Sequence, residues 1–215
     1  MSENELVKVD GMPVVPVGEK EFSALVGGDW LPRLQVVDSN SKVGKKNLAK
    51  VGNYALVRSE DDVVDLTNQV DALIIHMRWT AIDTNEDSLS FSHDKESDEF
   101  QRIQEESKVS NSGCMWGPEF LVYLPSVKSF ATFFCGSATA RRESKNIFKL
   151  LRKAATFKTH FIENKRYSWW GPLVTECTSP FDIPSEEEIK QEAVKFANPP
   201  KQEETEEAPA DGRER

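Results

Sequence analysis

Residue types that most often perform catalysis are few and scattered in this chain of 215 residues. No phosphate-binding glycine loop, nucleophile elbow or zinc-protease motif is present. The histidines and cysteines form no local pair with metal-ligand spacing. The sequence therefore predicts a protein that is not an enzyme and holds no cofactor or metal. The histidines are His76, His93 and His160, and the cysteines are Cys114, Cys135 and Cys177.

One acidic cluster offers an alternative. Carboxylates at Asp94, Glu96, Asp98 and Glu99 could together hold a divalent cation for nuclease chemistry. They lie in a serine-rich stretch with few apolar residues, and a solvated loop accounts for that composition better. A metal-dependent nuclease stays open as a lesser hypothesis.

Aromatic residues beside cations indicate a different chemistry. The stretch Thr156 to Pro172, TFKTHFIENKRYSWWGP, predicts a β-hairpin with a cationic tip. Because neighbours on a strand point to opposite faces, one of Trp169 and Trp170 should be in the core and the other exposed. An exposed aromatic next to cations suits stacking a base and holding its phosphate. The alternative is a core hairpin with an ordinary surface tryptophan.

The formal net charge of −9 is unevenly distributed. Residues 141–170 carry nine Lys or Arg against two Glu, a net charge of +7. Residues 83–106 carry nine acids against two bases, a net charge of −7, and residues 186–215 carry ten acids against five bases, a net charge of −5. A basic segment in an acidic chain favours a polyanionic partner, although it can also be the solvated face of a helix.

The expected contacts to nucleic acid combine cations for phosphates with aromatic rings for bases. Loop lysines before the first confident strand and the basic helix with its following hairpin supply most of them. The predicted contact residues are Lys42, Lys45, Lys46, Arg78, Trp79, Lys149, Arg152, Lys153, Lys158, Lys165, Arg166, Tyr167, Trp169 and Trp170.

The elements that must position these residues are predominantly strands. Residues 52–58 and 72–80 predict two strands, and residues 119–135 predict a long bent strand or a hairpin. Residues 137–153 predict an amphipathic helix, which is followed by the hairpin at 156–172. The order β-β-β-α-β-β predicts an α+β, β-rich fold of the oligonucleotide-binding (OB) type. That fold is a five-stranded barrel with a helix between strands three and four, and its ligand surface includes the loops after strands one and four.

The domain organisation follows from composition. Residues 1–184 are expected to form one OB-like domain, in which 83–111 is an acidic insertion that includes a helix near 97–107. A capping box at Ser185 and Glu188 predicts a C-terminal helix over 185–197. Residues 198–215 contain almost no apolar side chains and predict a disordered acidic tail.

Five stretches together resemble phage-encoded single-stranded DNA-binding proteins, which combine such a barrel with an acidic C-terminal tail. They are LPRLQ at 31–35, VGNYALV at 51–57, GPEFLVYLP at 117–125, KRYSWW at 165–170 and EETEEAPAD at 203–211. The resemblance implies a role in phage DNA replication or recombination, with replication or recombination proteins recruited through the tail. The last residues, Gly212 to Arg215, depart from the acidic-aromatic ending that many members use to recruit partners.

The sequence thus predicts non-enzymatic binding of single-stranded DNA, with RNA as a further candidate, at low sequence specificity. A phage structural protein, or one that acts on a host factor through its acidic surfaces, is the main alternative. No apolar run is long enough to cross a membrane and no signal peptide is evident, so we expect a cytoplasmic protein, in the host cytoplasm if phage-encoded. A homodimer is left open.

Overall fold

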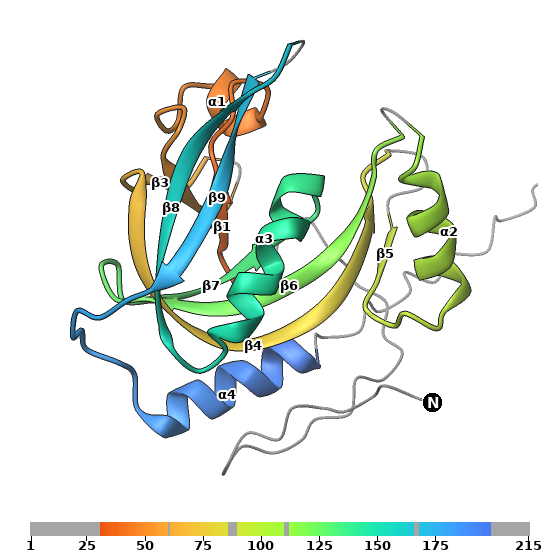
Figure 1. Cartoon of the computed structure of the whole chain (residues 1–215). Helices are drawn as coiled ribbons and strands as arrows, with labels where there is room; N and C mark the ends of the chain where they lie inside the picture. The colour runs from red at the N-terminus through yellow and green to blue at the C-terminus, as the bar shows by residue number, and fades with distance from the viewer. Residues whose placement is uncertain (1–30, 60, 86–89, 110–111, 166–167, 199–215) are drawn as a thin grey trace, which may run out of the picture.

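A computed structural model describes residues 31–59, 61–85, 90–109, 112–165 and 168–198. Across these residues nine strands form one strongly curved sheet (Figure 1). The strands are β1 (Arg33–Val36), β2 (Tyr54–Val57), β3 (Val63–Asp65), β4 (Gln69–Asp83), β5 (Ser90–Ser92), β6 (Cys114–Leu124), β7 (Ser129–Phe134), β8 (Ala154–Glu163) and β9 (Ser168–Glu176).

Four helices accompany the sheet within the described ranges, and a serine precedes each of them. The hydroxyl oxygens of Ser41, Ser97, Ser137 and Ser185 each accept a hydrogen bond from a backbone N–H of the first helical turn. The capping box predicted at Ser185 is confirmed. The helices are α1 (Lys42–Lys45), α2 (Asp98–Glu106), α3 (Ala138–Lys149) and α4 (Glu186–Ala197).

The sheet is open, and its strand order is β3-β2-β1-β7-β6-β4-β8-β9, with β5 also paired to β4. The β1–β7 pair is parallel, whereas the other pairs are antiparallel. The sheet curls until its first strands touch β8: the Tyr54 hydroxyl donates to the Lys158 carbonyl (3.2 Å) and the Thr159 hydroxyl donates to the Gly52 carbonyl. Curvature therefore brings the β1–β2 connection, which contains α1, against the β8–β9 hairpin.

Residues 120–124 of strand β6 are buried on both faces, which explains their unbroken apolar run. Phe120, Val122 and Leu124 join the main core inside the curved sheet. The intervening Leu121 and Tyr123 point to the opposite face, where they pack against α4. Helices α3 and α4 therefore cover opposite sides of the strand pair β4–β6 (Figure 1).

Helix α3 fills the space between β9 and the inside of the sheet. Its Ala140 and Ile147 belong to the main core, and its Glu143 carboxylate accepts a hydrogen bond from the backbone N–H of Val174 on β9 (2.6 Å). Since β9 ends the path of the sheet, this contact satisfies an edge N–H that has no neighbouring strand. The second turn of α3 is thereby fixed against β9.

Several predicted elements are confirmed, and their limits are corrected. The hairpin near 156–172 forms from β8 and β9, but β9 continues through Pro172 to Glu176, because proline is tolerated on a strand at the end of a sheet. The bent segment 119–135 is the hairpin β6–β7. The predicted helix over 137–153 ends at Lys149, and the loop predicted around Lys42 is the short helix α1.

The five-stranded barrel is not confirmed, since the sheet is open and contains nine strands in the described residues. The helix expected near 97–107 is confirmed as α2, but the described parts of 83–111 differ from the expected solvated loop. This segment contributes β5 and α2, and its Phe91, Phe100 and Ile103 are almost completely buried. Phe100 and Ile103 pack against Ala81 of β4 and Cys114 of β6, and such apolar burial favours a folded arrangement of an otherwise acidic segment.

Candidate nucleic-acid interface

Two tryptophans stack on the strand pair β4–β6. Trp79 pairs with Pro118, and Trp116 pairs with Ala81, so the two indoles are diagonal neighbours on one face of the sheet. Their ring centroids are 6.0 Å apart and their planes differ by 27°. Both side chains are half-buried, which leaves part of each ring accessible.

A cation lies over each tryptophan. The Lys95 ammonium is 3.7 Å from the centroid of the Trp79 ring, and the Arg141 guanidinium carbon is 5.1 Å from that of Trp116. Arg141 also donates to the carbonyl oxygens of Trp116 (2.8 Å) and Gly136, so it is held by three contacts. We call Lys95, Trp79, Trp116 and Arg141 the cation–tryptophan stack.

The first turn of α3 joins this stack to the β8–β9 hairpin. Arg141 lies on Trp116, while Thr139, two residues earlier, accepts a hydrogen bond from the indole N–H of Trp169 (3.1 Å). Gly171 allows the close approach, because a Cβ there would lie 2.8 Å from the Thr139 methyl carbon. Three of the chain's five tryptophans therefore meet around one helical turn.

A second aromatic patch lies further along the hairpin. Phe161, 53% exposed, contacts Trp170 with ring centroids 5.2 Å apart. The Trp170 ring covers Gly52, whose φ of +88° and 2.9 Å Cβ-to-ring distance both favour glycine. We call Phe161 and Trp170 the hairpin patch. The expectation that one of Trp169 and Trp170 is in the core and the other exposed was wrong: both are half-buried.

The predicted cations divide into two groups at different places. Lys158 and Lys165 are exposed on the hairpin, and the connection containing Lys42, Lys45 and Lys46 packs against it at Gly52 (Figure 1). The second group follows the other end of α3, where the Arg152 and Lys153 backbones bond to Ile74 of β4. That group consists of Lys149, Arg152 and Lys153, while Arg166 and Tyr167 lie outside the described residues.

Arg78 is not part of this exposed surface. It is 5% exposed, and its guanidinium pairs with the Glu119 carboxylate at 2.8 Å and donates to the Phe196 carbonyl of α4. Burial alone would raise the pKa of Glu119, but the charge of Arg78 lowers it below its usual range. The prediction that Arg78 contacts phosphate was therefore wrong, because that side chain is committed to a buried carboxylate and a helix end.

The same buried network fixes the protonation of His93. The Thr80 hydroxyl donates its proton to Glu119 (3.0 Å), so it can only accept from His93 Nδ1 (2.9 Å), and the Trp79 carbonyl also accepts from Nδ1 (3.2 Å). Nδ1 therefore bears the proton of a neutral imidazole. Burial, together with the charge of Arg78, lowers the pKa of His93 to about 3.

Acid should destabilise the fold through His93. The unfolded imidazole takes up a proton near its ordinary pKa of 6.5, whereas the folded one does so only near 3, so stability is complete above pH 6.5 and falls as the pH drops toward 3. We expect a loss of about 2 kcal/mol between pH 7 and pH 5. His93→Asn, whose amide can replace the Nδ1–H donor, should flatten this dependence in urea unfolding measured at both pH values. An equal loss in the variant would assign the effect to other groups.

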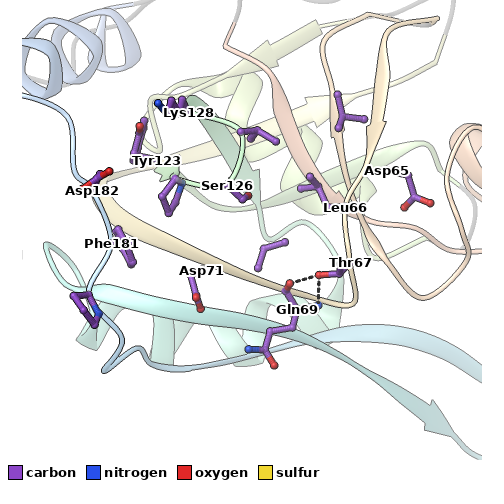
Figure 2. Close-up of a pocket in the computed structure, with 15 residues that line it drawn as sticks. Asp65, Leu66, Thr67, Gln69, Asp71, Tyr123, Ser126, Lys128, Phe181 and Asp182 are labelled. Atoms are coloured by element: carbon purple, nitrogen blue, oxygen red, sulfur yellow. Dashed lines mark hydrogen bonds between the residues drawn. The ribbon is translucent and has the colours of Figure 1, made fainter.

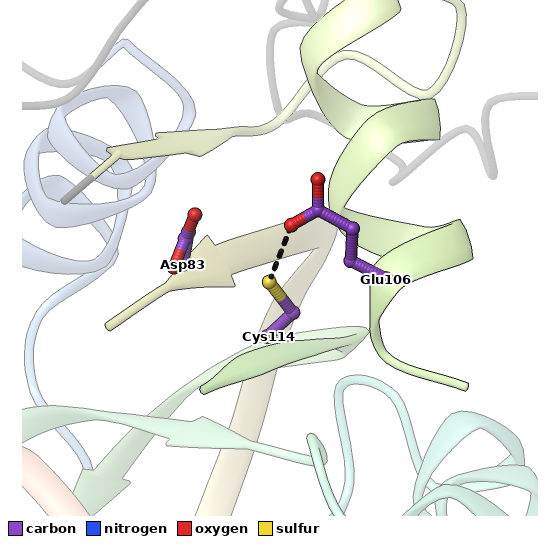
Figure 3. Close-up of side chains that lie close together, drawn as sticks. All are labelled: Asp83, Glu106 and Cys114. Carbon is purple, nitrogen blue, oxygen red and sulfur yellow. Dashed lines mark hydrogen bonds between the residues drawn. The ribbon is translucent and has the colours of Figure 1, made fainter. Parts of the chain in front are cut away.

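Three potential metal ligands gather beside α2 (Figure 3). Ligand atoms of Asp83, Glu106 and Cys114 all lie within 4.8 Å of one another. Arg102 already bridges both carboxylates, at 3.1 Å from Asp83 and 2.8 Å from Glu106. Mainly through burial, the pKa of the Cys114 thiol is raised to about 11, which keeps it protonated and donating to Glu106. This donor set fits an internal ion-pair network better than a metal.

The acidic residues first considered for a metal have local structural roles. Asp94 accepts the backbone N–H of Glu96 (2.9 Å), Asp98 lies in the first turn of α2, and Glu99 binds Arg102. Carboxylates in the first turn of a helix are stabilised by its dipole. These carboxylates therefore stabilise the start of α2 and the turn before it, and they do not converge on a shared metal position.

No protein-family model matches this chain, and no curated protein or solved structure is significantly similar to it. Within the described ranges, the helices lack the combination of length and apolar character that a bilayer crossing requires.

Sequence reasoning identified Trp79, Trp169 and Trp170 but missed Trp116, Lys95 and Arg141. The last two are far from the tryptophans in sequence: Lys95 reaches Trp79 from the connection between β5 and α2, and Arg141 reaches Trp116 through the packing of α3. A usable signal was present in CMWGPEF, where Trp116 directly precedes the Gly117-Pro118 step of a buried strand. Arg141 was counted only as part of the basic segment.

Proposed function

We propose that this chain is a non-enzymatic single-stranded DNA-binding protein of low sequence specificity that serves phage DNA replication or recombination. The observation that supports it most strongly is the cation–tryptophan stack. The half-buried indoles, with a lysine and an arginine over them, place aromatic surface and positive charge side by side, the combination that single-strand binders use for bases and the adjoining phosphates. Such contacts do not distinguish one base from another, because every base has a π face.

The order of elements supports an OB-type arrangement behind this surface. In chain order, β4, β6, β7, α3, β8 and β9 give β-β-β-α-β-β, with the helix between the third and fourth strands. The first of these strands pairs with the second and also with the fourth, as in a partly open Greek-key barrel. β1, β2 and β3 are then an addition, joined to β7 through β1, so the strand near 52–58 that was expected to be the first of the barrel lies outside this set, and 119–135 supplies two of its strands instead of one.

This assignment defines where a bound single strand of DNA would run on the protein. The loops after the first and fourth strands of an OB fold border its ligand surface, and here they are residues 84–113 and 164–167. Lys95 of the stack comes from the first loop, and Lys165 comes from the second. A DNA strand running from the stack across the first turn of α3 would reach Trp169 on the face of the hairpin that contacts α3, whereas the hairpin patch lies on the opposite face, where Trp170 covers Gly52.

A titration tests the proposal. Anisotropy of a fluorescein-labelled dT oligonucleotide of about twenty nucleotides is measured at 50 and 200 mM NaCl, beside a duplex and a U oligonucleotide of equal length. We expect saturable binding of dT, weaker binding of the duplex, and a loss of about tenfold or more in affinity at the higher salt. Absence of binding to dT at low salt, or a preference for the duplex, would contradict the proposal.

The hairpin cations should contribute to the salt dependence. Lys158→Gln with Lys165→Gln removes two exposed charges from the hairpin. Removing one cation from a phosphate lowers the slope of log K against log salt by about 0.7 for a single strand, so the slope should fall by about 1.4. Lys190→Gln with Lys195→Gln on α4 is the charge-matched control and should leave the slope unchanged. Equal effects of the two pairs would show that only net charge matters.

A further inference from the structure

A groove of about 850 Å³ lies away from the cation–tryptophan stack (Figure 2). Three parts of the chain form its walls: residues 64–71 from β3 to the start of β4, residues 123–128 at the β6–β7 turn, and residues 180–182 before α4. None of the predicted nucleic-acid contacts lines it. It is a separate surface on the molecule.

The floor of the groove is apolar. Three half-buried side chains pack against the main core and also line the groove: Val64, Leu66 and Val127. Phe181 covers one side and is also half-buried. An apolar side chain of a bound molecule would gain free energy by displacing water from this floor.

The rim of the groove is acidic. Asp65, Asp71 and Asp182 border it, against the single cation Lys128, and in the view of Figure 2 Asp71 lies between the other two. Asp65 accepts from the backbone N–H of Lys50 (3.1 Å), and Asp71 accepts from the Thr156 hydroxyl (2.6 Å). These donors are neutral, and among the described residues none of the three aspartates forms an ion pair.

We propose that this groove docks an extended segment of a partner protein in which lysine or arginine alternates with apolar residues. Apolar side chains would occupy the floor, and the cations would face the acidic rim, because alternate side chains of an extended chain point in opposite directions. Charge excludes a nucleic acid from this surface, since phosphates would meet three aspartates.

Charge also argues against the chain's own ends as the occupant. Residues 1–30 carry six acids and two bases, and residues 199–215 carry six acids and three bases. Both segments share the sign of the rim. A basic segment from another protein is therefore the occupant that the groove complements.

The test uses a fluorescein-labelled octapeptide that alternates lysine with leucine, with the corresponding glutamate–leucine and lysine–serine octapeptides as probe controls. Anisotropy with the full chain at low salt should show binding of the lysine–leucine peptide and at least tenfold weaker binding of the other two. Amide shifts of the isotope-labelled chain on adding the peptide should concentrate in 64–71, 123–128 and 180–182. Shifts concentrated in the acidic residues 203–211 would overturn the proposal.

Two variants and a control separate the groove from general charge attraction. Asp182→Lys should weaken peptide binding about tenfold, and Phe181→Ser about fivefold. Glu187→Lys, an equal charge change on exposed α4, should alter it less than twofold. Equal losses in Asp182→Lys and Glu187→Lys, or no loss in Phe181→Ser, would overturn the proposal. Binding of dT should not weaken in Asp182→Lys, so failure of peptide docking and failure of DNA binding are observed separately.

Discussion

A chain with Trp79→Ala and Trp116→Ala should bind a dT oligonucleotide about a hundredfold more weakly than the unchanged chain. Each base stacked on an aromatic side chain contributes about 1–3 kcal/mol, so losing both indoles should cost about 3 kcal/mol, a factor of roughly a hundred in Kd. The change also removes the surfaces on which Lys95 and Arg141 rest. Anisotropy of a labelled oligonucleotide, which does not depend on tryptophan emission, measures the effect.

Conservative replacements separate stacking from folding. Trp79→Phe with Trp116→Phe keeps two aromatic faces and should lose less than tenfold in affinity, while far-ultraviolet circular dichroism and urea unfolding report whether each variant is folded. Both tryptophans pack against the cluster around Phe100 and Ile103, so some loss of stability is expected in the alanine variant. A folded alanine variant with unchanged affinity would contradict the proposed role of the stack.

Much of the fold was predictable because its signals are local. Apolar runs and alternation predicted the hairpins β6–β7 and β8–β9, an amphipathic pattern predicted α3, and a capping box predicted α4. The extent of the sheet was not predictable in the same way. The parallel pairing of β1 with β7 joins residues about a hundred positions apart, and no short pattern encodes such a pairing.

Adjacency in the sequence led to the wrong prediction that Arg78 and Trp79 contact nucleic acid together. Arg78 and Trp79 are neighbours, but consecutive residues of a strand point to opposite faces. Arg78 consequently meets Glu119 under α4, whereas Trp79 faces the other side and meets Trp116. The cations that do accompany the tryptophans, Lys95 and Arg141, come from segments that only the tertiary fold brings close.

Removing the charge of Arg78 should be the most destabilising single substitution among those considered. In Arg78→Met the Glu119 carboxylate stays buried without its cation, which typically costs about 3–5 kcal/mol. The Phe196 carbonyl at the end of α4 also loses its donor, and the ring of Phe196 loses a cation 4.1 Å from its centroid. Urea unfolding at pH 7 measures the loss in free energy of unfolding.

A double substitution identifies the cause. Arg78→Met with Glu119→Leu removes the stranded charge and should recover at least half of the lost stability, because well-packed apolar pairs often replace buried ion pairs with little or no cost. Since Arg78 lies beneath α4 and away from the cation–tryptophan stack, the double variant should bind dT with unchanged affinity and salt slope. A single variant that loses less than about 1 kcal/mol would mean that the pair is hydrated. If the slope of log K for dT binding against log salt is smaller in the folded double variant, Arg78 contacts DNA after all.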